Sequence, residues 1–70
     1  MDVELAKKLK AGDYVAAKPN NRVVLPGRYE LLEDPLPSRE PTGIVVEDQV
    51  LFAIDYQGNG RHLFSSRYFQ

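Results

Sequence analysis

The chain has 70 residues, no cysteine and a formal net charge of −1. A chain this short buries only about 60% of its unfolded surface, so residues 1–70 predict one small domain of modest stability. The composition excludes disulfides, thiolate metal sites and a zinc centre built from histidines, because His62 is the single histidine, and the near-neutral charge argues against a dedicated non-specific nucleic-acid binder.

Residues 1–10 predict a short helix, with a loose N-terminal arm as the alternative. This segment is charged and lacks the apolar region of a signal peptide. Asp2 is a good N-cap residue, and Gly12 stands where a C-cap glycine belongs. Between them, Leu5 and Leu9 fall on one face of the helix, and Glu4 and Lys8 form an i,i+4 ion pair.

The segment from residue 11 to residue 41 predicts short strands joined by irregular connections. Period-two alternation and β-branched runs indicate strands over residues 12–18, 22–25 and 28–32. The turn residues at 19–21 separate the first two of these strands. Three prolines fall within residues 33–41, and because proline removes a backbone donor, we expect a surface loop there.

The C-terminal part predicts a three-strand meander. Its strands are expected at residues 42–47, 50–56 and 61–65. Asp48-Gln49 is expected to connect the first two strands, and Gly58-Asn59-Gly60 supplies the positive-φ residues of a tight hairpin. The last five residues predict a single turn that carries an aromatic plug for the core.

Three short motifs follow one another around the long irregular excursion. The first is a Gly-Asp-x-Val start, formed by Gly12, Asp13 and Val15. The second is a Gly-x-Val strand with Gly43 and Val45, and the third is an Asp-Tyr-x-Gly hairpin with Asp55, Tyr56 and Gly58. Together with the closing turn, they make residues 11–69 resemble the SH3-like barrels of the KOW and Tudor type. The resemblance implies a mainly β fold: a partly open barrel with a short N-terminal helix. An OB-like or other meander barrel stays open.

No polar cluster in the sequence amounts to a catalytic, metal or nucleotide signature. His62, Ser65 and Asp55 imitate an acid–base–nucleophile set, but His62 and Ser65 fall on opposite faces of a regular strand. The acidic residues lack the spacing of a calcium loop. The glycines at 58 and 60 precede a strand, whereas phosphate loops precede a helix. We therefore expect no enzyme activity and no cofactor.

Two surfaces remain as candidate binding sites. A basic and aromatic surface suits single-stranded nucleic acid, because cations follow the phosphates and rings stack on bases. An acidic pair suits a basic protein partner. The basic and aromatic surface consists of Arg61, His62, Arg67, Tyr68 and Phe69, and the acidic pair consists of Glu33 and Asp34.

The sequence therefore favours a small module that binds a protein partner, and the alternative is an accessory domain that binds nucleic acid. The longest apolar run, residues 50–54, is far shorter than the roughly 20 residues of a membrane helix, so no membrane partner is expected. The missing cysteines fit a reducing, cytoplasmic location for a polypeptide that starts at its own Met1. An exposed sheet edge would permit a weak homodimer instead of a monomer.

Overall fold

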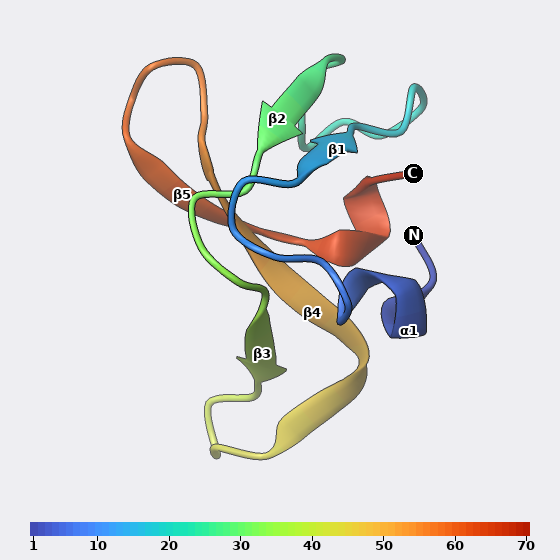
Figure 1. Cartoon of the computed structure of the whole chain (residues 1–70). Coiled ribbons are helices and arrows are strands. Elements are labelled where there is room, and N and C mark those ends of the chain that lie inside the picture. Colours follow the sequence, from blue (N-terminus) through green and yellow to red (C-terminus); the bar gives the residue numbers. More distant parts are fainter.

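The computed structural model describes residues 1–70 and is mainly β, with five strands in two antiparallel sheets. A two-stranded sheet pairs β1 (Tyr14–Ala16) with β2 (Arg28–Glu30). The second sheet has the order β3–β4–β5, formed by Leu36–Arg39, Val45–Asp55 and Arg61–Ser65. A three-strand meander at the C-terminal end is present as predicted, but the strands expected at residues 42–47 and 50–56 are both part of β4, and β3 takes the place of the first strand. Figure 1 shows the long β4 crossing the molecule between its two partners. The two sheets do not close into a barrel.

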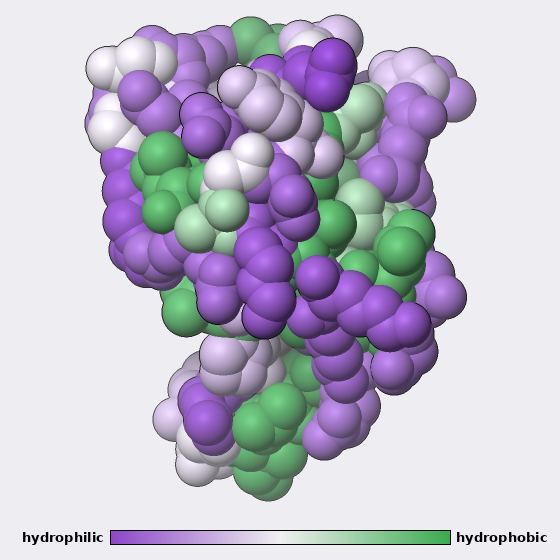
Figure 2. Space-filling model, viewed as in Figure 1, coloured by the Kyte–Doolittle hydropathy of each residue, from purple (hydrophilic) through white to green (hydrophobic).

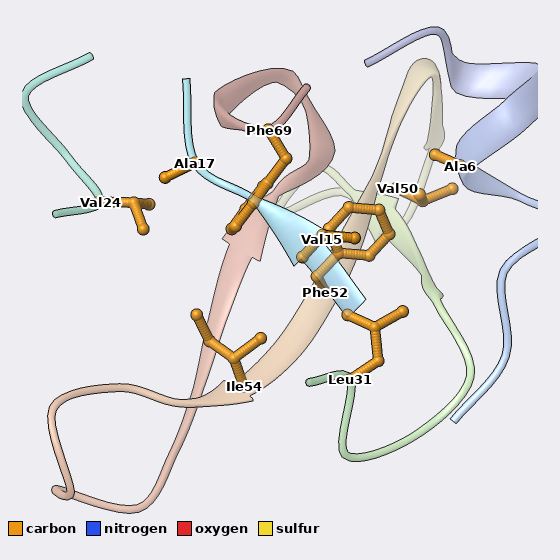
Figure 3. Close-up of a cluster of buried hydrophobic side chains, with 9 residues drawn as sticks. All are labelled: Ala6, Val15, Ala17, Val24, Leu31, Val50, Phe52, Ile54 and Phe69. Carbon is orange, nitrogen blue, oxygen red and sulfur yellow. The ribbon is translucent and has the colours of Figure 1, made fainter. Parts of the chain in front are cut away.

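The core is built from both sheets and from the two ends of the chain. Alternate side chains of β4 face it, while β1 and the C-terminal segment cover them from the other side (Figure 3). Phe69 packs edge-on against Phe52 with ring centroids 5.4 Å apart. The predicted aromatic plug is thereby confirmed. The buried cluster consists of Ala6, Val15, Ala17, Val24, Leu31, Val50, Phe52, Ile54 and Phe69.

Helix α1 (Val3–Ala6) is shorter than predicted, but it is docked rather than a loose arm. Ala6 is fully buried in the core, and Val3 and Leu9 pack against the cluster. The prediction that Leu5 shares this buried face is wrong, since Leu5 is 56% exposed. A helix this short is held by such packing, because isolated helices of a single turn are unstable in water.

The ends of α1 differ in how well they were predicted. The Asp2 carboxylate accepts a hydrogen bond from the backbone N–H of Glu4 at 3.2 Å, which confirms the N-cap. The predicted ion pair with Lys8 is wrong, because Glu4 lies 3.8 Å from the ammonium group of Lys7. Gly12 is no helix cap: the helix ends earlier, and the Gly12 N–H donates to the carbonyl of Leu31 at 2.8 Å.

The strand expected at residues 22–25 is absent. The side chain of Asn21 accepts hydrogen bonds from the backbone N–H groups of Val23 and Val24, at 2.8 and 2.6 Å. This local turn competes with strand pairing, as asparagine side chains commonly do. Val24 consequently points into the core, while Leu25 stays exposed.

The prediction of a surface loop at residues 33–41 is also wrong, because this segment contains β3 (Leu36–Arg39). Pro37 is accommodated because β3 is an edge strand, where a missing N–H costs no ladder hydrogen bond. The pairing with β4 shifts by a bulge between Pro37 and Ser38.

The connection expected at residues 48–49 does not exist, because β4 runs unbroken through it. The hairpin turn lies earlier, where Gly43 N–H donates to Glu40 at 2.8 Å and Glu40 N–H donates to Ile44 at 2.9 Å. This β3–β4 hairpin projects from the body of the molecule (Figure 1). Figure 2 shows hydrophobic surface at the bottom of the molecule, where this hairpin lies. Ile44, beside the turn, is 64% exposed.

Strand β5 and its hairpin agree with the prediction. Gly58 and Gly60 adopt φ angles of 73° and 86°, which only glycine reaches without strain. The 3-10 turn η1 (Ser66–Tyr68) follows β5 and leads to Phe69, which pairs with Ala17 beside β1. None of the helices has the length and apolar character needed to cross a bilayer.

Candidate functional site

The predicted basic surface and the predicted acidic surface meet in an ion pair. Arg61 at the start of β5 donates to the carboxylate of Glu33 through two nitrogens, at 2.6 and 3.2 Å. These two hydrogen bonds hold the pKa of Glu33 below its usual value and raise the pKa of Arg61. Both groups are therefore charged at neutral pH, and each offsets the other.

Asp34 is used locally as well. Its carboxylate accepts a hydrogen bond from the backbone N–H of Ala11 at 2.9 Å and lies 4.0 Å from the ammonium group of Lys10. The predicted acidic pair thus ties the segment before β3 to β5 on one side and to the segment after α1 on the other. Neither carboxylate is a free docking charge.

The rest of the predicted basic and aromatic surface is dispersed. Arg67 lies 3.5 Å from the carboxylate of Asp48. Tyr68 is half-buried and packs against the core. Phe69 is fully buried, so its assignment to a binding surface is wrong and only its role as a plug holds. His62 is exposed at the hairpin, with its Nδ1 2.9 Å from the carbonyl of Gly60.

Apolar side chains also collect on the outer face of the three-stranded sheet, which is the face directed away from the core. Ala53 is fully buried, yet it does not belong to the core cluster. Leu63 of β5 lies directly opposite Ala53, and Leu32 donates its N–H to the Ala53 carbonyl from the other side at 2.9 Å. Leu32 and Leu63 therefore lie on the two sides of Ala53 in the sheet, and they are 47% (Leu32) and 41% (Leu63) exposed.

A second pair extends this surface along the sheet. Leu36 of β3 lies directly opposite Leu51 of β4, and both are half-buried outside the core cluster. Because directly opposed residues project to the same face, this pair continues the row that contains Ala53. We call this surface the outer apolar patch: Leu32, Leu36, Leu51, Ala53 and Leu63.

A polar ladder borders the outer apolar patch on β4. The Gln49 side chain donates to Ser38 of β3 at 3.0 Å and accepts a hydrogen bond from the hydroxyl of Ser65 of β5. These bonds cross all three strands of the sheet. They connect β3, β4 and β5 directly beside the patch.

The sequence-based prediction missed this face. Residues 50–54 form a continuous apolar run, so the sequence did not distinguish core positions from outer ones. The signal lies in the alternation along β4, where Val50, Phe52 and Ile54 face the core and the residues between them face outward.

The structure contains no pocket and no group of three or more acidic or histidine side chains arranged to hold a metal ion. Comparisons of the chain with protein-family models, with curated proteins and with solved structures gave no match. The resemblance to SH3-like barrels therefore stays a prediction from the sequence.

Proposed function

We propose that this chain is a non-catalytic module that binds a protein partner through the outer apolar patch. The observation that carries the proposal is the exposure of Leu32 and Leu63, at 47% and 41%, on either side of the fully buried Ala53. Exposed apolar side chains gathered on one rigid face mark protein contact sites, because covering them removes apolar surface from water. The partner presents apolar side chains to this face.

The charged groups support an apolar contact over an electrostatic one. Arg61 and Arg67 each have a carboxylate beside them, from Glu33 and Asp48. A neighbouring carboxylate offsets the positive charge that attracts nucleic-acid phosphates. A phosphate of a nucleic acid, the ligand of the alternative function, would compete with these carboxylates for the two arginines.

The proposal is tested by affinity capture from native cell extract with three baits: the wild-type chain, Leu32→Lys and Leu5→Lys. Leu5 is a matched control, because it is at least as exposed as Leu32 but lies on α1. We expect a protein captured by the wild-type and Leu5→Lys baits that survives nuclease treatment. Leu32→Lys is expected to reduce its affinity by roughly tenfold or more, as the loss of a central apolar contact does.

Two results would overturn the proposal. Equal capture by the Leu32→Lys and Leu5→Lys baits would show that the outer apolar patch is not the contact surface. Capture that disappears after nuclease treatment would replace the proposal with nucleic-acid binding.

A further inference from the structure

One edge of the three-stranded sheet has backbone groups without partners. Strand β5 pairs only with β4. Tyr56 N–H donates to the Gly60 carbonyl at 3.3 Å, so these two residues form a hydrogen-bonded pair. Along antiparallel strands, hydrogen-bonded pairs alternate with pairs that are not hydrogen-bonded to each other. His62 and Phe64 therefore exchange hydrogen bonds with β4, and the residues between them direct their N–H and C=O groups away from it. Those outward residues are Arg61, Leu63 and Ser65.

The opposite edge of the sheet is protected. Leu36 and Leu51 form a hydrogen-bonded pair, because Leu32 N–H bonds to Ala53 on the same side of β4. The next residue of β3, Pro37, therefore faces the free edge, where it has no N–H to offer. The bulge after Pro37 interrupts the edge further. Proline and bulges are devices that prevent strand addition, and β5 has neither.

The sequence of β5 is complementary to itself in one antiparallel register. With Leu63 opposite Leu63 of a second copy, Arg61 faces Ser65 and His62 faces Phe64, so no two like charges oppose each other. The outward residues of β5 are the ones that would exchange N–H···O=C bonds in this register. Arg61 keeps Glu33 as its partner, because its side chain lies on the outer face and not in the edge.

We propose that a second copy of this chain adds to the free edge of β5, antiparallel and about a two-fold axis at Leu63. Two three-stranded sheets then join into one sheet of six strands. The outer apolar patches of the two copies become continuous, because Leu63 belongs to both the patch and the edge. The inference goes beyond the proposed function: it adds self-association through the strand edge to the binding of a protein partner through the patch.

The experiment is sedimentation of the purified chain from micromolar to millimolar concentration. We expect the average mass to rise from that of the 7.9 kDa monomer toward twice this value. Leu63→Lys brings two ammonium groups together at the axis and is expected to weaken self-association by about fivefold, since like charges directly opposite each other destabilise a strand pair. Leu32→Lys, in the patch but away from the edge, is the matched control and leaves most of the self-association intact.

A second variant tests the backbone alone. Chemical synthesis can place an N-methyl group on Leu63, which removes the central edge donor without changing a side chain or a bond to β4. We expect this variant to sediment as a monomer. The same modification at Arg39, an outward residue of the protected β3 edge, is expected to leave the dimer intact.

The two proposals fail in different ways. A chain that stays monomeric at every concentration, or a dimer that survives both changes at Leu63, overturns the strand addition. Neither result alters the capture of a protein partner that depends on Leu32. The proposed function would instead be overturned if the wild-type bait captured no protein partner that depends on Leu32 while the chain still dimerised with rising concentration.

Discussion

Phe69→Ala is expected to lower the free energy of unfolding by about 3–5 kcal/mol, because it removes a fully buried ring and leaves a cavity. The ring makes edge-on contacts with Phe52 and Tyr29, with centroids 5.4 and 6.4 Å away. The single core of a domain this small supplies a total stability of roughly 3–5 kcal/mol. Most molecules of the variant should therefore unfold at low denaturant, as measured by urea titration and circular dichroism.

The control for this prediction is Tyr14→Ala. The Tyr14 side chain is 57% exposed, and the Arg28 guanidinium lies 5.2 Å from its ring centroid. An exposed cation–π contact stabilises by about 1 kcal/mol at most, so the loss should stay below that value. If Phe69→Ala proves as mild as Tyr14→Ala, the C-terminal segment does not close the core.

Ser66→Ala is expected to cost about 1–3 kcal/mol, because it leaves a buried backbone donor without a partner. The Ser66 hydroxyl accepts the N–H of Val50 at 3.1 Å, and both residues are buried. At this point β5 has turned into η1, so the serine side chain replaces the backbone carbonyl that a continuing strand would supply. The measurements are chemical denaturation and the hydrogen-exchange rate of the Val50 amide, which should rise.

Ser38→Ala provides the matched control for Ser66→Ala. Ser38 is also buried, but its hydroxyl accepts from the side chain of Gln49 and not from the backbone. Gln49 is half-buried and can turn toward water, so the expected loss is below about 1 kcal/mol. Equal losses in the two variants would contradict the special role assigned to the Val50 N–H.

The parts of the fold that the sequence predicted well are those governed by local chemistry. Gly58 and Gly60 form the turn of the last hairpin, and the alternation of side chains over residues 61–65 predicts β5. Strand β3 was missed because proline normally argues against a strand. Its position at a sheet edge removes that objection, and edge position depends on the whole topology.

The candidate site was less predictable for the same physical reason. Arg61 and Glu33 were assigned to separate surfaces, but they are 28 residues apart and meet only through tertiary packing. The Asp48-Gln49 pair has the composition of a turn, yet it lies within β4, where Gln49 bonds to both neighbouring strands. Leu32 and Leu63 become one surface only because Ala53 lies between them.

Residue-resolved hydrogen exchange in dilute protein measures directly whether the edge of β5 is open. We expect slow exchange for the amides of His62 and Phe64, which bond to β4, and fast exchange for the amide of Leu63, which points away from β4. Slow exchange of the Leu63 amide in the dilute monomer would show that this edge is already paired and that no free edge exists for a second copy.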